Sequence, residues 1–391
     1  MKLIVETHLF PEQLIGKLAK NSKAGLDFAA HNLSQALLKG FEENDQDVFV
    51  LNVPSVGSFP VLNKCFKIPE IQLKNGISVQ YNNIPVLKRK EIVRNKLKHL
   101  KRFLKSVGDE KVVYITYNLK GFSYLKRVKE ILPTIKICSI ITDLPQFMNI
   151  PTQYGALSKL QAKNNSLNTD LIDGFILFAP LMKEPLNVGE RPWIHMEGIY
   201  NPDGAEVKCE KEKNKTILYT GNLGRKYGVM EMLKAFSMID SPDYRLWIRG
   251  GGECENIIRQ EAERDKRIVF FESMGRKQII ELQQKATVLL NPVKPSEEFT
   301  RYFFPSKTLE YMASGTPVLM YHLACMPQEY GDYIYYMKDE SVECLRDSII
   351  NVCSKPSDEL NVFGLRACEF INNCKTPKKQ LNKIINFVKE L

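Results

Sequence analysis

Glycine and charged side chains follow short apolar runs at several points in the second half of the chain. In the segment TILYTGNLGRKYGV (216–229), Gly221 follows an apolar run, and Arg225 and Lys226 lie in the loop behind it. Glycine lets a backbone approach a ligand closely, and the amides of a following helix favour anions. Two cations in the same loop can neutralise a diphosphate. The segment predicts a phosphate site, and the alternative is an ordinary glycine-rich turn with solvated charges.

Two further segments have similar chemistry. RGGGE (249–253) places Gly250 after another apolar run, where successive glycines permit either ligand approach or a tight turn. FFPSKTLEYMASGTPV (303–318) predicts a helix with Ser306 as its N-cap and Lys307 beside an anion site. Glu310, one turn later, can accept hydrogen bonds from a ribose diol. The alternative is a capped helix in which Glu310 is only structural.

Cysteine and histidine argue against a metal site. The nine cysteines include no C-x-x-C pair, and there are only five histidines. Reduced, mostly buried thiols are therefore expected in place of disulfides or zinc ligands. We expect no metal and no bound cofactor.

Short apolar runs alternate with helix-like stretches along the whole chain. The hydrophobic content of 44% excludes a mostly disordered chain. This alternation predicts parallel sheets covered by helices, and it occurs twice, which predicts two doubly wound, Rossmann-like α/β domains facing a cleft. The expected strands are 2–7, 47–52, 112–117, 136–142, 174–178, 216–220, 245–249, 268–271, 288–290 and 317–321. The expected helices are 25–43, 88–105, 230–238, 255–264, 276–285 and 307–313.

The polar run between residues 200 and 214 predicts a domain boundary. We expect an N-terminal domain over residues 1–200, a C-terminal domain over 201–375, and a closing helix over 376–391 that packs back on the first domain or simply ends the chain. Ligands of such sheets bind beyond the carboxyl ends of the strands.

Positive charge is concentrated in the first half. Residues 1–200 hold 27 of the 55 basic residues and only 18 of the 45 acidic ones, so they carry +9 of the net charge of +10. Lys88–Lys105 contains nine basic residues and only Glu91 as an acid, with apolar residues at helical spacing. This helix is either a solvated surface helix or a contact with an anionic membrane. Nucleic-acid binding has only charge in its favour, and we expect none.

The order of the blocks over residues 215–335 resembles the C-terminal domain of GT-B glycosyltransferases, specifically the retaining family 4. The blocks are the TG loop ending in YGV, the glycine turn, VLLNP, and FPSK-x-x-EYM-x-x-GTPV. The resemblance over 1–200 is looser and includes the Ala24-Gly25 loop.

The resemblance implies that the second domain binds a nucleotide-sugar donor. Arg225, Lys226, Gly25, Ser306 and Lys307 are the expected diphosphate ligands, and Lys226 is favoured because it precedes Tyr-Gly-Val. Further contacts are expected from Glu310, Gly221, Gly250 and Met274 to the nucleotide and from Tyr302 and Phe304 to the donor sugar.

Two positions differ from the family pattern. Tyr302 stands where the family has the first Glu of its Glu-x7-Glu motif, and Thr142-Asp143 stands in place of a His-Asp pair. Asp143 is the expected catalytic polar group, with His8 second. Structural roles for both, as a helix cap and a packed histidine, are the alternatives.

The function implied is a retaining, hexosyl-type transfer from a nucleoside-diphosphate sugar, with UDP favoured, to a saccharide hydroxyl. A polyprenyl-linked acceptor in bacterial surface polysaccharide synthesis suits the basic first half. No run approaches the roughly 18 apolar residues that cross a bilayer, and the first residues make a poor signal peptide, so a cytoplasmic location is expected. The alternatives are a non-catalytic GT-B partner of another transferase and a sugar-nucleotide epimerase.

Overall fold

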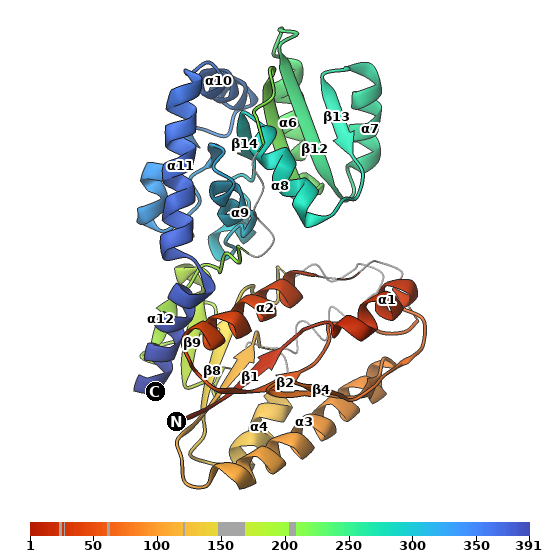
Figure 1. Cartoon of the computed structure of the whole chain (residues 1–391), viewed down its shortest axis with the longest axis vertical. Coiled ribbons are helices and arrows are strands. Elements are labelled where there is room, and N and C mark those ends of the chain that lie inside the picture. The colour runs from red at the N-terminus through yellow and green to blue at the C-terminus, as the bar shows by residue number, and fades with distance from the viewer. Residues whose placement is uncertain (23–25, 27, 61–62, 120–121, 148–168, 203–208) are drawn as a thin grey trace. The chain divides into compact units, whose positions relative to one another are not determined.

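The computed structural model describes residues 1–22, 26, 28–60, 63–119, 122–147, 169–202 and 209–391. These residues form two compact units, one of Met1–Ile199 with Pro377–Leu391 and the other of Tyr200–Thr376 (Figure 1). The division after Ile199 lies one residue before the predicted boundary. Gly25, one of the predicted phosphate-binding residues, lies outside the described residues.

The first unit is built on an eight-stranded sheet with the order β10-β9-β8-β7-β1-β2-β5-β4. Its pairs are parallel except for β4 with β5. The strands are β1 (Lys2–Thr7), β2 (Val48–Asn52), β4 (Ile71–Leu73), β5 (Gly76–Ser78), β7 (Val112–Tyr117), β8 (Lys136–Ile141), β9 (Gly174–Leu177) and β10 (Trp193–His195), and a separate antiparallel pair joins β3 (Lys67–Ile68) and β6 (Tyr81–Asn82).

Helices cover both faces of this sheet. They are α1 (Glu12–Asn21), α2 (Phe28–Glu43), α3 (Pro85–Val107), α4 (Phe122–Ile131) and α12 (Pro377–Glu390). Figure 1 shows α2 on one face and α3 with α4 on the other. The closing helix α12 lies against α2. Gly40 permits this approach, because a Cβ there would lie 2.5 Å from the carbonyl oxygen of Pro377.

The second unit has a six-stranded, wholly parallel sheet with the order β13-β12-β11-β14-β15-β16. The strands are β11 (Lys215–Asn222), β12 (Tyr244–Gly251), β13 (Ile268–Phe271), β14 (Val288–Asn291), β15 (Val318–Tyr321) and β16 (Tyr335–Met337). The helices are α6 (Val229–Ser237), α7 (Glu255–Arg264), α8 (Arg276–Lys285), α9 (Lys307–Ala313), α10 (Val342–Cys353) and α11 (Ser357–Cys374).

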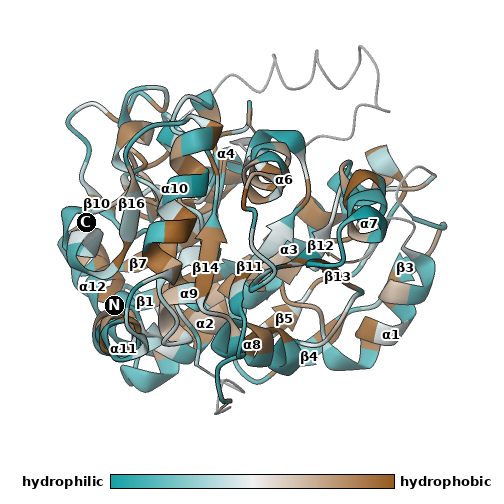
Figure 2. Ribbon diagram, turned by 90° about the horizontal axis from the view of Figure 1, so that it is seen from above, coloured by the Kyte–Doolittle hydropathy of each residue, from teal (hydrophilic) through white to brown (hydrophobic). Residues whose placement is uncertain are grey.

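Right-handed crossovers place α6 and α7 on one face of this sheet and α8 and α9 on the other. Helix α10 packs against α6, and α11 packs against α9. Burial on both faces explains why β14 and β15 are apolar throughout except for Asn291. In Figure 2, β7 and β14 are brown whereas α7 is largely teal, as expected for strands covered by amphipathic helices.

All ten predicted strands are present, most within one or two residues of the expected bounds, and all six predicted helices are present. Other elements were not predicted, and they are the helices α1, α4, α10 and α11 and the short strands β3, β4, β5, β6, β10 and β16. Among the described residues, no helix is long and apolar enough to cross a membrane.

Candidate anion-binding site of the second unit

The candidate site lies at the carboxyl ends of β11 and β14. The order β12-β11-β14-β15 means that the chain leaves β11 toward one side of the sheet and β14 toward the other. Such a switch point is where open α/β sheets bind ligands. The loop after β11 reaches the end of β14, because a Cβ on Gly228 would lie 2.0 Å from the carbonyl oxygen of Pro292. Only glycine allows this approach, and Gly228 also has φ +76°.

Helix α9 is tied to the end of β11. The hydroxyl of Tyr311 accepts a hydrogen bond from the Thr220 amide at 2.7 Å and donates to the Thr220 carbonyl at 3.0 Å. Tyr311 is fully buried, so these bonds fix the first turn of α9 against the strand end. This anchoring sets the position of Lys307, the first residue of α9.

The ammonium of Lys307 is buried without a hydrogen-bonding partner among the described residues. Its Nζ lies 4.1 Å from the centre of the Tyr219 ring, and burial lowers the pKa of Lys307 to about 7. A buried polar group without a partner is uncommon and calls for an explanation. An anion at this edge would supply the missing acceptor and restore the charged form.

Glycines make room for this lysine. A Cβ on Gly221 would lie 3.0 Å from Nζ of Lys307, and Gly221 has φ +151°, which side chains rarely adopt. Glycine is required at position 250 for a different reason, since a Cβ there would lie 1.8 Å from the carbonyl oxygen of Gly221. The RGGGE segment therefore brings the ends of β11 and β12 together, and a nucleotide contact at Gly250 stays a prediction.

The predicted pair Arg225 and Lys226 lies in the short 3₁₀ helix Arg225–Tyr227. The amide of Arg225 donates to Glu253 at 2.8 Å, while its side chain is exposed. The Nζ of Lys226 lies 5.2 Å and 5.0 Å from the rings of Tyr227 and Phe299. These rings hold Lys226 in place by cation–π attraction.

Glu310 follows Lys307 by three residues, so both lie on one face of α9. The side chain of Glu310 reaches solvent, but the protein around it raises the pKa of its carboxyl, against the opposing charge of Arg276. The carbonyl of Met274 lies 3.5 Å from a guanidinium nitrogen of Arg249, the residue that precedes the three glycines. Arg249 and Arg276 thus add positive charge that the sequence reasoning did not assign to the site.

Three predicted residues have surroundings that modify their expected roles. Ser306 occupies the N-cap position of α9, but its side chain makes no capping hydrogen bond, which corrects that prediction. The ring of Phe304 is only 3% exposed and packs 5.9 Å from the ring of Tyr330. This places Phe304 in the core and argues against a contact between its ring and a donor sugar. Tyr302 is partly exposed, with the Arg301 guanidinium 5.7 Å from its ring.

Besides Lys307, Asn291 is a buried polar residue at this edge without a hydrogen-bond partner among the described residues, and it was not predicted from the sequence. It ends β14, is fully buried, and neither atom of its side-chain amide has a hydrogen-bond partner among the described residues. Its place after three buried apolar residues was the available signal, because a polar residue at a strand's carboxyl end is a candidate ligand.

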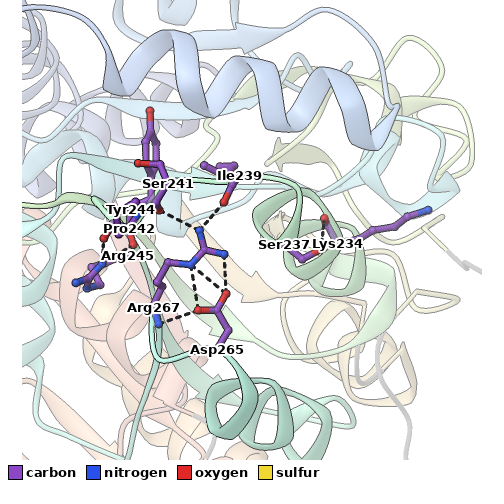
Figure 3. Close-up of polar contacts among 9 residues, drawn as sticks. All are labelled: Lys234, Ser237, Ile239, Ser241, Pro242, Tyr244, Arg245, Asp265 and Arg267. Atoms are coloured by element: carbon purple, nitrogen blue, oxygen red, sulfur yellow. Dashed lines mark hydrogen bonds and ion pairs between the residues drawn. The ribbon is translucent and has the colours of Figure 1, made fainter.

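Two arginines at the opposite end of the sheet, Arg245 and Arg267, have polar partners. Arg267, just before β13, forms an ion pair with Asp265 at 2.7 Å and donates to the carbonyls of Ile239 and Ser241 (Figure 3). Arg245 likewise donates to backbone carbonyls. Unlike Lys307, both of these half-buried arginines have polar partners.

The predicted catalytic residues of the first unit follow β1 and β8. The Nδ1 of His8 lies 2.8 Å from the Val53 carbonyl, and its ring packs edge-on against Tyr117 at 5.0 Å. The hydroxyl of Tyr117 lies 3.3 Å from that of Thr142, which donates to Asp143 at 2.9 Å. Contacts therefore connect His8 to Asp143 along the carboxyl edge of this sheet, and their catalytic roles stay predictions.

Comparison with known proteins adds a family to this geometry. Residues 214–355 match the family model described as Glycosyl transferases group 1. The second unit is thus similar to a group 1 glycosyltransferase domain over this segment. It contains every element of the candidate site, from β11 to α9. No curated protein is similar enough in sequence to count as a match.

Solved structures share the whole fold. Sucrose-phosphate synthase from Thermosynechococcus elongatus is similar with TM-score 0.66 and 14% identity, covering 100% of this chain and 99% of that one. Trehalose-phosphate synthase (UDP-forming) from Burkholderia vietnamiensis gives 0.62 and 9%, covering 100% and 97%. The pneumococcal O-GlcNAc transferase GtfA gives 0.59 and 11%, covering 100% and 99%. The predicted GT-B fold is confirmed.

Proposed function

We propose that this glycosyltransferase transfers a sugar from a nucleoside diphosphate sugar to a saccharide hydroxyl. The observation that carries the proposal is the buried, unpartnered ammonium of Lys307 at the end of β11, beside Gly221. The diphosphate of the donor would be its acceptor, with Arg225 and Lys226 in the adjoining loop. Glu310, on the same face of α9, would bind the ribose diol.

We propose UDP as the nucleotide and retention as the stereochemical outcome. Two similar structures support UDP by their descriptions: the GtfA structure is a complex with UDP and GlcNAc, and the Burkholderia enzyme is described as UDP-forming. In a front-face displacement the bond from the anomeric carbon to the diphosphate breaks as the bond to the acceptor oxygen forms. The acceptor attacks from the face that the diphosphate leaves, so the sugar keeps its configuration, and the leaving phosphate oxygen takes the acceptor proton.

The cations supply the catalysis in this scheme. Charge develops on the leaving diphosphate, and Lys307, Arg225 and Lys226 would stabilise it without a metal ion. Asp143 and His8 are the proposed polar groups of the first unit that act near the transferred sugar. The proposed acceptor is a lipid-linked saccharide of bacterial surface polysaccharide synthesis, reached at the inner face of the cell membrane, and the strongly basic α3 supports it.

Thermal unfolding against UDP, GDP, ADP and their sugars, with and without EDTA, tests the donor. Ligand that binds only the native protein adds about 2.7 kcal/mol to the free energy of unfolding at 100-fold excess over Kd. We expect a shift of the midpoint with the uridine nucleotides that EDTA does not change. The absence of a shift with every nucleotide would favour a non-catalytic GT-B partner instead.

Substitution tests the site. We expect Glu310→Ala and Lys226→Ala each to abolish transfer while the unfolding midpoint stays unchanged, because both side chains lie at the edge of the unit rather than in its core. Turnover close to that of the unsubstituted protein in both variants would contradict the assignment.

A further inference from the structure

Helices α3 and α4 of the first unit border a second cationic site that is open to solvent, far from α9 in sequence. A cavity of about 730 Å³ lies between them. Its lining includes Arg89, Lys90 and Arg94 from α3, Arg127 from α4, and apolar surface from Val86 and Val93. None of its described lining residues is acidic. We call this cavity the α3–α4 pocket.

The four cations of the pocket are exposed and have no hydrogen bond or ion pair to any other described residue. The only acid of α3, Glu91, does not neutralise them. Its carboxylate accepts a hydrogen bond from the backbone amide of Asn82 at 2.6 Å and others from the Asn82 side chain. Charge of one sign held around a cavity creates a field that attracts anions.

The structure also separates these cations from the other lysines of α3. Lys96, which the sequence placed on the basic face, is buried and paired with Glu6 at 2.8 Å. Lys98 lies 3.7 Å from Glu70, and Lys88 donates to the carbonyl of Val56. Fewer basic side chains of α3 are therefore unpaired than predicted. Those without a partner among the described residues lie at the pocket and near the C-terminal end of α3.

Apolar side chains are exposed beside the pocket. Ile84, Val86 and Leu87, at the start of α3, have exposed fractions of 40%, 70% and 39%. A free phosphate makes no favourable contact with apolar side chains, whereas the interface of a bilayer binds apolar side chains together with cations. Anionic lipids offer both partners, a phosphate for the arginines and acyl chains for the apolar rim.

We propose that the α3–α4 pocket binds the phosphate headgroup of an anionic lipid and docks the first unit on a membrane surface. This inference rests on the proposed function in one respect, since a lipid-linked acceptor is reached from such a surface. Arg89, Arg94 and Arg127 contact the phosphate, and Val86 and Leu87 enter the headgroup region.

Sedimentation of the full chain with vesicles tests the proposal. We expect the protein to sediment with mixed vesicles of phosphatidylglycerol and phosphatidylcholine and to stay in solution with phosphatidylcholine alone. The variant Arg89→Gln/Arg94→Gln/Arg127→Gln should partition about 100-fold more weakly. The charge-matched control Lys234→Gln/Lys266→Gln/Lys383→Gln removes exposed lysines elsewhere, and Figure 3 shows Lys234 pointing away from its neighbours. It should bind as the unsubstituted protein does.

A second variant separates a lipid from a soluble polyanion. Val86→Ser/Leu87→Ser keeps every charge and should lower vesicle partitioning about tenfold, because less apolar surface enters the interface. Equal partitioning of the arginine variant and the control would overturn the proposal. A second outcome would also overturn the proposal. In it, vesicles would not sediment the protein, and a sulfated oligosaccharide in solution would bind the unsubstituted protein and the serine variant but not the arginine variant.

The same arginine variant distinguishes this inference from the proposed function. Its nucleotide-induced shift of the unfolding midpoint should match that of the unsubstituted protein, because the donor site belongs to the second unit. If the unsubstituted protein did not bind vesicles but nucleotides still shifted its unfolding midpoint, the lipid pocket alone would be refuted. Vesicle binding with no nucleotide shift would refute the donor site alone.

Discussion

Two buried lysines, one in each unit, have opposite surroundings. Lys96 of α3 and Lys307 of α9 both stand over a tyrosine ring, at 3.8 Å from Tyr124 and 4.1 Å from Tyr219. Burial lowers the pKa of both. Lys96 has a carboxylate partner 2.8 Å away in Glu6, whereas Lys307 has no hydrogen-bonding partner among the described residues.

The partner of Lys96 is itself well satisfied. Glu6 also accepts hydrogen bonds from the hydroxyls of Tyr114 and Thr116, each at 3.1 Å. Burial alone would raise the pKa of Glu6, but the charge of Lys96, the nearby His8 and the hydrogen bonds from Lys96 and Tyr114 together keep this pKa below its usual value. A closed cluster of this kind belongs to the architecture of the unit. The ammonium of Lys307 has no such partner among the described residues, which supports our proposal that it binds a ligand.

The largest expected effect concerns the structural lysine. Lys96→Ala leaves the carboxylate of Glu6 buried without its counter-charge, which costs about 3–5 kcal/mol of the free energy of unfolding. Urea denaturation of the full chain measures this loss. The double variant Glu6→Gln/Lys96→Met, which removes both charges, should recover most of it. If Lys96→Ala unfolded at the same urea concentration as the unsubstituted protein, the pair would have no structural role.

Substitution of Lys307, the proposed ligand-binding lysine, should have the opposite effect on stability. Lys307→Met keeps the apolar stem but removes an unpaired polar group, so the free energy of unfolding should stay the same or increase. Affinity for the nucleotide sugar should fall by about 10- to 150-fold, the range for one hydrogen bond to a charged group. Calorimetric titration with UDP-sugars measures the second effect. Undiminished affinity together with lost stability would make Lys307 a second structural lysine.

Much of this contrast was hidden from the sequence. Both lysines lie on helices that the periodic apolar residues predicted, and both helices, α3 and α9, are present. The pairing of Lys96 depends on Glu6, which lies 90 positions earlier in the chain, and no local pattern reports such a contact. Lys307 was predicted as a site residue from the FPSK segment, and this role stays a prediction, but the missing partner of its ammonium is a property of the folded unit.

Strands were easier to predict than their connections. Buried parallel strands such as β9 and β15 are continuous apolar runs, and this composition identifies them without tertiary information. The two- and three-residue strands β3, β6 and β16 are too short to carry a period and exist because neighbouring backbone offers hydrogen bonds. The burial of Phe304 was not predicted for a similar reason, since its neighbour Tyr330 lies outside the motif that contains it.

A pH dependence follows from the unpaired state of Lys307. In the free protein its pKa is about 7, and a bound diphosphate favours the charged form and raises this pKa. Affinity should therefore be constant below about pH 7 and weaken as pH rises, by up to about tenfold per unit, until the pKa of the complex is reached. A nucleotide sugar is the proper ligand, because its diphosphate diester does not titrate in this range.

Lys307→Met is the control for that profile, and its affinity should not vary with pH over the same range. A profile that is equally steep in both proteins would assign the titration to another group. The paired lysine offers the matching comparison, because the contact with Glu6 persists whether or not ligand is present, so Lys96 should contribute nothing to the pH dependence of binding.

The smallest expected effect on donor affinity comes from Gly221, the residue beside Lys307. In Gly221→Ala the new Cβ lies 3.0 Å from Nζ of Lys307 and stands on backbone with φ +151°, so the lysine must shift and the loop is strained. Strain of this kind costs about 1–3 kcal/mol, and we expect a similar loss divided between folding and donor affinity. Gly331→Ala, where nothing lies within 4 Å of the added Cβ, is the matched control. Because Lys307→Met removes the crowded ammonium, the alanine should weaken donor binding less in that background than in the unsubstituted protein. Equal effects in both backgrounds, measured as a double-mutant cycle, would show that Gly221 is needed only for the strand end and not for the lysine beside it.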